Sequence, residues 1–564
     1  MKNFFLSFFW VVFFAIGPVA HADVPAAEGM VVAANPHATK AGVEILERGG
    51  SAVDAAIAVQ AVLGLVEPQS SGIGGGAFLL TYDAASGTVR AYDGRETAPV
   101  AVDETLFLNP DGTPMGFWEA IVGGRAVGVP GLVALLYEAH RREGNLTWAE
   151  LFQPAIELAN RGFRISPRLA FLIGRDKYLP TFPRTREYFY LPDGTPKPVG
   201  TILKNPDYAQ SLQAIADQGP DAFYRGPLAQ EIVSTVRNTP QNPGQLSLED
   251  MAAYKARMRP PLCLPYKTFK ICGMPPPSSG GLAVLQILGL LAPFKLESVE
   301  PLSVQSVHLI AEAGRLAFAD RNYYVGDPDF VDVPLDALLD EKYLDGRSTL
   351  ISPTRAMGKA KPGLIIPDLS APPPQFEPPS TTHFSIIDKK GNAVSMTSSV
   401  ENAFGSRLMA GGFILNNQIS DFSFVPAVEG RPVANRVEAG KRPRSSMAPT
   451  LVLDDTGAFY GAIGSPGGSR IIGYTANALV AMLDWNLPPQ EAVSLPHFLN
   501  RNGPTELEKD IRLAGLIPAL EALGHEIKQP VMNSGLHGIL KTGQGLEGGA
   551  DPRREGTVMI TSGG

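Results

Sequence analysis

Two hydroxyl residues, Thr381 and Ser399, stand at the ends of a predicted β-hairpin. Residues 382–388 and 393–400 have the pattern of strands, and the Lys-Lys-Gly-Asn segment at 389–392 has the composition of a turn. If the hairpin is symmetric about this turn, Thr381 lies opposite Ser399, with both side chains on one face and within hydrogen-bonding range. The sequence therefore predicts a pair of interacting hydroxyls.

The position of Thr381 suits a particular chemistry. It directly follows residues 352–380, a stretch that holds eight prolines and favours extended backbone. A threonine hydroxyl here can attack the preceding carbonyl, and cleavage then frees an α-amine beside the same hydroxyl. Such an amine, with a pKa of about 8, is a recognised base for activating a threonine nucleophile. Taken alone, the residues fit more simply an ordinary threonine-rich edge strand.

The elements around this hairpin divide the chain in two. Residues 38–48 and the segment from Ser51 to about Leu65 are predicted helices, the second apolar on nearly all sides and so deeply buried. Residues 78–82 form a predicted strand, and 130–320 are mainly helical, including 148–160 and 303–320. A helix-rich part therefore ends at Ser380, and a strand-rich part begins at Thr381.

Composition and the first residues indicate an exported globular protein. Hydrophobic residues make up 44% of the chain and the net charge is -8, which disfavours nucleic acid as a partner. Lys2, an apolar run to Ile16 and Ala20-His21-Ala22 have the pattern of a cleaved signal peptide over residues 1–22. The run is shorter than the roughly 20 residues of a spanning helix, so no membrane anchor is expected. We expect a periplasmic or secreted protein.

The two cysteines, Cys263 and Cys272, lie on a second predicted hairpin, which turns at Lys267-Thr268. Counting outward from the turn pairs the two cysteines at a non-hydrogen-bonded position, where Cα atoms approach to about 4.5 Å. An oxidising compartment favours a disulfide between them. Two reduced cysteines acting as small hydrophobic side chains fit nearly as well.

Several motifs occur in an order that resembles γ-glutamyltransferases, also called γ-glutamyltranspeptidases or glutathione hydrolases. The resemblance runs from about residue 30 to the C-terminus. The motifs that carry it are Thr381–Ser385 (TTHFS), Pro275–Gly281 (PPPSSGG), Tyr324–Val331 (YVGDPDFV), Leu415–Gln418 (LNNQ) with Asp421-Phe422, Arg442–Pro449, and Gly464–Ile471 (GSPGGSRI).

The resemblance implies an α+β fold, the Ntn-hydrolase αββα sandwich. It also implies that one precursor cuts itself into a large subunit, residues 23–380, and a small subunit, residues 381–564, which pair as a heterodimer. Thr381 would be the nucleophile and the new N-terminus, and Ser399 would hold its hydroxyl. The residues implied as donors to the tetrahedral oxyanion are Gly467 and Gly468.

The resemblance also implies how a γ-glutamyl group is bound. Arg95 would clamp its α-carboxylate, since a planar guanidinium suits that task. Ser445 and Ser446 would add hydroxyl donors, while Gln418 and Asp421 would face the α-ammonium. Without the resemblance, Arg95 fits a surface ion pair equally well. Ser445, Ser446 and Gln418 then fit polar positions in turns and strands. No metal or cofactor is expected, because the histidines show no paired ligand spacing.

Two departures from the family pattern concern the substrate. Glu401 stands where familiar members carry Asn. Some members carry Glu at position 418, where this chain has Gln, so the acid and the amide are exchanged between the two positions. The stretch between Asp421 and Ser445 is about five residues shorter than in the best-known enterobacterial type, and it contains no Tyr or Trp to gate the pocket. His383, beside the nucleophile, is expected on the opposite strand face and outside the site.

The resemblance implies γ-glutamyl transfer or hydrolysis, with glutathione as the natural donor. An acylase of the same fold that acts on glutaryl-type amides is an alternative, which Glu401 and Asp421 disfavour because a glutaryl group has no ammonium. An uncleaved, non-enzymatic relative is a further alternative, which the complete set of Thr381, Ser399 and the glycine pair disfavours.

Overall fold

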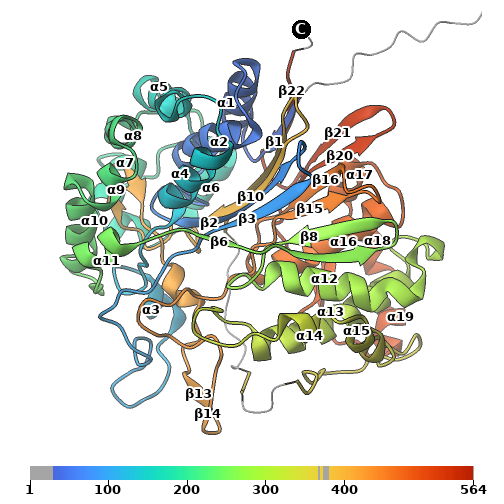
Figure 1. Cartoon of the computed structure of the whole chain (residues 1–564). Coiled ribbons are helices and arrows are strands. Elements are labelled where there is room, and N and C mark those ends of the chain that lie inside the picture. Colours follow the sequence, from blue (N-terminus) through green and yellow to red (C-terminus); the bar gives the residue numbers. More distant parts are fainter. Residues whose placement is uncertain (1–28, 366–368, 372–379, 563–564) are drawn as a thin grey trace, which may run out of the picture.

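The computed structural model describes residues 29–365, 369–371 and 380–562 (Figure 1). The expected signal peptide and most of the proline run before Ser380 lie outside the described residues. Within the described ranges, no helix combines the length and the apolar character needed to cross a membrane.

Two β-sheets form the centre of the molecule, and each takes strands from both sides of Thr381 (Figure 1). The larger sheet has the order β22-β1-β9-β10-β2-β3-β6. These strands are Thr557–Ile560, Met30–Ala33, Thr382–Ile387, Ala393–Ser399, Gly76–Asp83, Thr88–Gly94 and Arg257–Arg259. The smaller sheet has the order β21-β20-β16-β15-β8-β7. Its strands are Gly545–Ala550, His537–Thr542, Phe459–Gly464, Thr450–Leu453, Phe269–Gly273 and Leu262–Tyr266.

Helices cover the outer face of each sheet, which confirms the αββα order and the Ntn-hydrolase fold. The seven-stranded sheet contacts α1, α2 and α4, and the six-stranded sheet contacts α12, α16 and α17. The bounds of these six helices are Pro36–Glu47, Ala52–Val66, Leu132–Glu143, Gly280–Leu291, Ile471–Leu483 and Pro489–Ser494. The long helix α13 (Val304–Tyr324) packs on α12. The parts before and after Ser380 therefore follow one another along the chain but are interleaved in the folded structure.

Smaller elements complete the two helical layers and the loops. The helices are α3 (Phe117–Ile121), α5 (Gln153–Arg161), α6 (Pro167–Arg175), α7 (Pro183–Phe189), α8 (Pro206–Gln218), α9 (Asp221–Tyr224), α10 (Pro227–Arg237), α11 (Leu248–Ala253), α14 (Leu335–Leu338), α15 (Glu341–Ser348), α18 (Ile511–Ala514) and α19 (Ile517–Ala522). The short strands are β4 (Phe163–Arg164), β5 (Ile202–Leu203), β11 (Met409–Ala410), β12 (Phe413–Ile414), β13 (Ala427–Val428), β14 (Arg431–Pro432), β17 (Phe498–Asn500), β18 (Thr505–Leu507) and β19 (Ile527–Lys528).

The central strands are buried on both faces, because each face meets a different hydrophobic core. On β1, Val31 and Ala33 join the core beneath α1 and α2, while Met30 and Val32 join the core that includes the second sheet. Side chains alternate along a strand, so a strand between two cores is buried at every position. This double burial gives the hairpin that carries Thr381 a rigid base.

The predicted elements are confirmed, with one local difference. Helix α2 is capped by Ser51, whose side chain accepts from the Asp54 N–H, and all of its residues are buried. The helix predicted over 148–160 is split: a 3₁₀ turn covers Trp148–Phe152, and α5 follows it. Proline lies in the first turn of α5, where its missing N–H costs no hydrogen bond.

The cysteine hairpin is confirmed. Strands β7 and β8 pair Cys263 with Cys272, and the two sulfurs form a disulfide with a Cα–Cα distance of 4.1 Å. The alternative of two reduced cysteines is therefore wrong for this structure.

Candidate active site

The hairpin of β9 and β10 brings Thr381 and Ser399 together as predicted. Thr382 pairs with Ser398, so the next residues outward face each other. The Thr381 Oγ1 and Ser399 Oγ atoms are 3.1 Å apart. The Ser399 hydroxyl also accepts a hydrogen bond of 2.8 Å from the Glu401 N–H. This bond fixes the Ser399 oxygen, and through it the Thr381 hydroxyl.

The backbone of Thr381 is strained and held at several points. Its φ angle is +102°, a value that costs a β-branched residue on the order of 1–3 kcal/mol. Arg554 Nη1 donates to the Thr381 carbonyl at 2.8 Å, and the Ser380 hydroxyl donates to the Gln69 carbonyl at 2.7 Å. The peptide bond between Ser380 and Thr381 is therefore anchored on both sides of a strained residue.

A cavity of about 40 Å³ opens at Thr381. Eight of the ten residues that the sequence predicts for the site line it, and Arg95 and Gly467 do not. The full lining is Arg321, Thr381, Ser399, Glu401, Gln418, Asp421, Arg444, Ser445, Ser446, Met447, Gly468 and Ile471. Such a volume admits water and little more.

One side of this cavity is rich in hydrogen-bond acceptors. Burial raises the pKa of Glu401 well above its ordinary value, and the neighbouring Asp421 adds to the rise. The Glu401 Oε2 and Gln418 Oε1 atoms are buried and have no hydrogen-bond partner among the described residues. Gln418 Nε2 donates to Asp421 Oδ2 at 3.2 Å. Unsatisfied buried acceptors are costly, so this wall is suited to a ligand with several N–H donors.

Arg95 lies behind this wall and is fully buried. Its Nη2 forms an ion pair of 2.5 Å with Asp421 Oδ2 and donates to the Arg444 carbonyl, while its Nε donates to the Pro443 carbonyl. Arg95 thus compensates the charge of Asp421, and Glu401 is left as the acid whose ionisation is disfavoured. In this structure Arg95 reaches the cavity only through Asp421.

The glycine pair forms the turn between β16 and α16. Gly467 and Gly468 have φ angles of +141° and +61°, conformations that glycine adopts without a steric penalty. A Cβ on Gly467 would lie 2.7 Å from the ring of Tyr474. The turn needs glycine for both reasons, and it brings the Gly468 backbone to the cavity.

Two arginines in the cavity wall were not identified from the sequence. Arg321 on α13 donates through Nη2 to the Ser446 hydroxyl at 2.6 Å and through Nε to the Ser279 hydroxyl at 3.0 Å. Arg444 Nη1 donates to the Arg321 carbonyl at 3.4 Å. Arg444 adjoins the predicted Ser445-Ser446 pair, so its position in that motif was an available signal.

The strand face expected for His383 was wrong, whereas its expected place outside the site agrees with the cavity lining. Residues two apart on a strand share a face, so His383 lies on the same side of β9 as Thr381. Its Nδ1 is 2.8 Å from Thr397 Oγ1 and its Nε2 is 3.3 Å from Ser385 Oγ. It is fully buried and does not line the cavity, and burial lowers its pKa well below the ordinary value. His383 is a neutral residue of the inter-sheet core.

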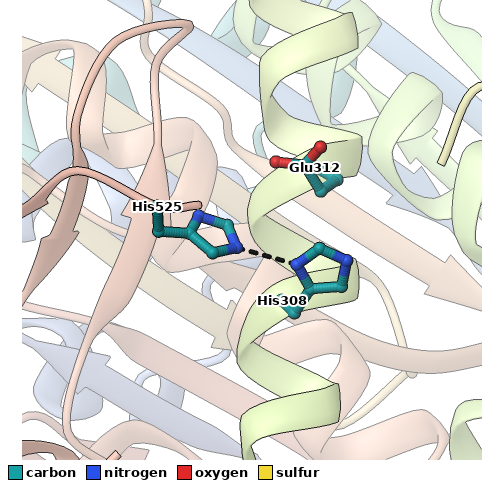
Figure 2. Close-up of side chains that lie close together, drawn as sticks. All are labelled: His308, Glu312 and His525. Carbon is teal, nitrogen blue, oxygen red and sulfur yellow. Dashed lines mark hydrogen bonds between the residues drawn. The ribbon is translucent and has the colours of Figure 1, made fainter. Parts of the chain in front are cut away.

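A second polar cluster lies away from this cavity, where His308 and Glu312 on α13 meet His525 (Figure 2). Each residue can offer one ligand atom within 4.8 Å of the others, a proximity that sequence spacing could not show. His308 Nδ1 and His525 Nε2 are 2.7 Å apart, and their other ring nitrogens contact the Ser352 carbonyl and the Thr505 hydroxyl. Both Glu312 oxygens accept hydrogen bonds, from Arg315 and from the Met357 N–H.

These contacts form a hydrogen-bond network around His525, and they predict a pH-dependent contribution to stability. Burial and the nearby His308 lower the pKa of His525 to about 4. The unfolded chain takes up this proton at pH near 6.5, so the contribution is complete above that pH and is lost as pH falls towards 4. Thermal unfolding of His525→Gln should therefore depend less on pH over this range than that of the wild type.

The control for this prediction is His140→Gln, which changes a histidine outside the cluster. Equal pH dependence of the wild type and His525→Gln would contradict the assignment. Added Zn²⁺ should leave the unfolding midpoint unchanged, because binding would have to break the hydrogen bond between His308 and His525.

The comparisons with known proteins agree on the family of the chain. The family described as "Gamma-glutamyltranspeptidase" matches residues 38–561. The glutathione hydrolase proenzyme of Escherichia coli is 37% identical over 542 residues, covering 94% of this chain and 91% of the relative. An acylase ACY 1 proenzyme of Pseudomonas sp. is 36% identical over 552 residues, covering 95% and 94%.

A solved structure is also similar to this chain in its fold. The crystal structure of cephalosporin acylase from Bacillus halodurans aligns with a TM-score of 0.82 at 27% identity, covering 99% of this chain and all of that one. The hairpin, the acceptor-rich wall and the glycine turn agree with the family match over most of the sequence. The chain therefore belongs to the gamma-glutamyltranspeptidase family.

Proposed function

We propose that the chain is the precursor of an N-terminal-threonine enzyme that transfers γ-glutamyl groups. It cuts itself between Ser380 and Thr381 and then transfers the γ-glutamyl group of glutathione and related compounds to water or to amine acceptors. The large subunit is residues 23–380 and the small subunit is residues 381–564. Strands β9 and β10 lie between β1 and β2, so the two chains stay paired after the cut.

The geometry at Thr381 supports self-cleavage. Its hydroxyl oxygen attacks the carbonyl carbon of Ser380, the C–N bond breaks, and an ester joins the two residues. Water then hydrolyses the ester, leaving a carboxylate on Ser380 and a free α-amine on Thr381. The strained φ of Thr381 favours this step, because the cut removes the constraint that imposes it. The small cavity of the uncut chain supports a zymogen that the cut opens.

The freed amine makes catalysis possible. With a pKa of about 8, it accepts the hydroxyl proton of Thr381 as the oxygen attacks the γ-glutamyl carbonyl. The amine of the donor leaves with that proton, and water or an acceptor amine then attacks the ester. Ser399 positions the nucleophile, and the backbone N–H groups of Gly467 and Gly468 stabilise the oxyanion. Loss of one such donor costs about 3 kcal/mol of barrier.

The observation that carries the substrate assignment is the pair of unpartnered acceptors in the cavity. Glu401 Oε2 and Gln418 Oε1 are buried without partners among the described residues, beside the carboxylate of Asp421. An α-ammonium has three donors and one positive charge, and it satisfies all three groups. The hydroxyls of Ser445 and Ser446, with the nearby arginines, are placed to bind the α-carboxylate.

Arg95 acts in this proposal mainly by fixing Asp421. Its buried guanidinium binds that carboxylate and two carbonyls. Its Nη1 lies 3.8 Å from Glu96 Oε2 and has no hydrogen-bond partner among the described residues. A direct clamp on the substrate carboxylate, as the resemblance implies, requires the side chain to move once the cut opens the cavity.

An acylase that takes glutaryl donors remains the second candidate. The acylase of Pseudomonas sp. is 36% identical to the chain and the glutathione hydrolase of Escherichia coli is 37% identical, so overall sequence similarity does not separate the two. The acceptor wall does, because a glutaryl group offers no donors to it. Purified protein should release glutamate and cysteinylglycine from glutathione; hydrolysis of glutaryl amides without any release from glutathione would favour the acylase.

Arg554 is a testable positioning residue for self-cleavage. It donates to the Thr381 carbonyl through Nη1 and to the Ser534 carbonyl through Nε. Arg554→Lys keeps the charge but cannot make both bonds, and a hydrogen bond to a charged group contributes about 1.5–3 kcal/mol. We expect the small chain to form roughly 10- to 100-fold more slowly, measured by gel time course. Arg512→Lys, on the surface, is the control, and a wild-type rate in Arg554→Lys would exclude this role.

The short stretch after Asp421 predicts the balance between hydrolysis and transfer to an amine acceptor. Its aromatic rings are buried elsewhere: Phe422 is fully buried, and Phe424 stacks on Phe107 with ring centroids 4.4 Å apart. No residue from 422 to 443 lines the described cavity. Water therefore competes well with amines, and hydrolysis should exceed transfer to glycylglycine at low millimolar acceptor, measured by product chromatography. Dominant transfer under those conditions would contradict an open pocket.

Export completes the proposal. Residues 1–22 act as a signal peptide cleaved after Ala22, and the mature protein is periplasmic or secreted. The disulfide between Cys263 and Cys272 supports this, since disulfides persist in oxidising compartments.

A further inference from the structure

Arg407 is a fully buried arginine in the loop that carries Glu401. This loop joins β10 to β11, and within it Glu401 has a φ angle of +77° and Arg407 a φ angle of +66°. Residues with a Cβ rarely adopt such angles, and they persist only where the surrounding contacts impose them. Arg407 does not itself line the cavity at Thr381.

The guanidinium of Arg407 supplies contacts that hold this loop. Its Nε and Nη2 donate to Asp176 Oδ2 at 3.1 and 2.8 Å. Its Nη1 donates to the Gly405 carbonyl, and its Nη2 also donates to Asn402 Oδ1, both at 2.5 Å. Because Asn402 directly follows Glu401, Arg407 fixes the backbone from which the Glu401 side chain projects.

The positive charge of Arg407 also acts on Glu401. Burial and Asp421 raise the pKa of the Glu401 carboxyl, and the guanidinium of Arg407 opposes that rise. The guanidinium is itself paired with Asp176, whose side chain is 8% exposed, and lies 5.6 Å from the ring centroid of Trp118. Charges act more strongly where water is excluded. Asp176 and Trp118 precede Ser380 in the chain, so this contact joins the two proposed subunits.

We propose that Arg407 is the positioning residue that holds Glu401 at the substrate ammonium, and that it thereby sets the preference for γ-glutamyl over glutaryl donors. This inference rests on the proposed γ-glutamyl transfer. Glu401 Oε2 has no hydrogen-bond partner among the described residues, so its direction depends on the backbone that Arg407 fixes. Through Asp176, the large subunit takes part in recognition by a residue of the small subunit.

Arg407→Lys tests the positioning. Lysine keeps the positive charge, but a single ammonium on a flexible stem cannot replace the four hydrogen bonds of the planar guanidinium. The measured quantity is kcat/KM for γ-glutamyl-4-nitroanilide divided by kcat/KM for glutaryl-4-nitroanilide. We expect this ratio to fall about 10- to 100-fold, mainly through KM of the γ-glutamyl donor. The value for the glutaryl donor should stay within about twofold, which shows an intact nucleophile.

The matched control is Arg315→Lys. It changes another buried arginine, which pairs with Glu312 at 2.7 Å and does not line the cavity, and it should leave the ratio unchanged. All proteins are compared after processing into two chains, so a slower cut does not enter the ratio.

Two variants of opposite charge test the electrostatic effect. Arg407→Gln removes a positive charge near Glu401, which makes ionisation of that carboxyl harder, so the ratio should rise at higher pH than in the wild type. Asp176→Asn removes the negative partner of Arg407, so the ratio should rise at lower pH. General damage to the fold would not produce two shifts of opposite sign.

The other charged groups around Glu401 are the same in these proteins. They are Asp421 with its partner Arg95, and Arg321 and Arg444 in the cavity wall. The freed amine of Thr381 acts on both donors alike, so its titration cancels in the ratio.

The outcomes separate this inference from the proposed function. An unchanged ratio in Arg407→Lys, or an equal loss with both donors, would overturn the positioning role while leaving γ-glutamyl transfer in place. If the Arg407 variants do not fold, the shift in Asp176→Asn decides, and the absence of a shift would overturn the inference. A wild type that uses neither donor, or only the glutaryl donor, would overturn the proposed function and this inference with it.

Discussion

Thr381→Ala is expected to give a single uncleaved chain with no measurable γ-glutamyl transfer. The substitution removes the atom that attacks the Ser380 carbonyl in this proposal, and later the atom that would carry the acyl group. Wild-type protein should instead show two chains on a denaturing gel, the smaller of 184 residues and beginning at Thr381. Activity should fall by at least about 10⁴-fold, as it does when a covalent nucleophile is removed.

Two matched variants keep this prediction specific. Thr381→Ser retains a hydroxyl and should still cleave, whereas Thr382→Ala alters the neighbouring threonine, which faces the other core and should cleave normally. Cleavage of Thr381→Ala at the same bond would mean that another group, or a protease, makes the cut.

Glu401→Gln and Asp421→Asn are each expected to lower kcat/KM for γ-glutamyl donors by roughly 10²- to 10³-fold. Removing one side of a buried charge interaction costs about 3–5 kcal/mol, and both side chains line the cavity in which the α-ammonium would lie. Glutaryl donors lack that ammonium, so their kcat/KM should change little or rise. The measurement compares γ-glutamyl and glutaryl anilides on the wild type and both variants.

The pH dependence gives an independent check on Glu401. Burial and Asp421 raise its pKa well above the ordinary value, so ionisation of this carboxyl is disfavoured in the free enzyme. An ammonium ligand favours the ionised form, so binding releases the proton and becomes easier as pH rises. The γ-glutamyl to glutaryl ratio of kcat/KM should therefore rise with pH in the wild type, and should rise less in Glu401→Gln. If the ratio rises equally with pH in both proteins, Glu401 does not take part in substrate binding.

The local sequence was sufficient to predict the strands that carry the site and their register. The turn at 389–392 fixes the register of β9 and β10, so the pairing of Thr381 with Ser399 follows from counting. The same reasoning placed Cys263 opposite Cys272. Short hairpins leave few alternatives, because a shift of one residue would move every side chain of the strand to the opposite face.

Contacts between distant segments were beyond sequence reasoning. Arg554 reaches the Thr381 carbonyl across a separation of 173 residues, and His308 meets His525 across 217. Arg95 was identified from its motif, but its burial behind Asp421 depends on how two loops pack. The misplacement of His383 had a different cause: the alternation of a strand was counted incorrectly, and the structure corrects it.

The most direct test of the account is to stop the purified enzyme in acid during turnover of a γ-glutamyl donor and to map the peptides by mass spectrometry. The small chain is expected to begin at Thr381 and to carry one γ-glutamyl group as an ester on that same residue. A glutamyl group on any other side chain, or turnover by protein in which the bond between Ser380 and Thr381 is intact, would contradict it.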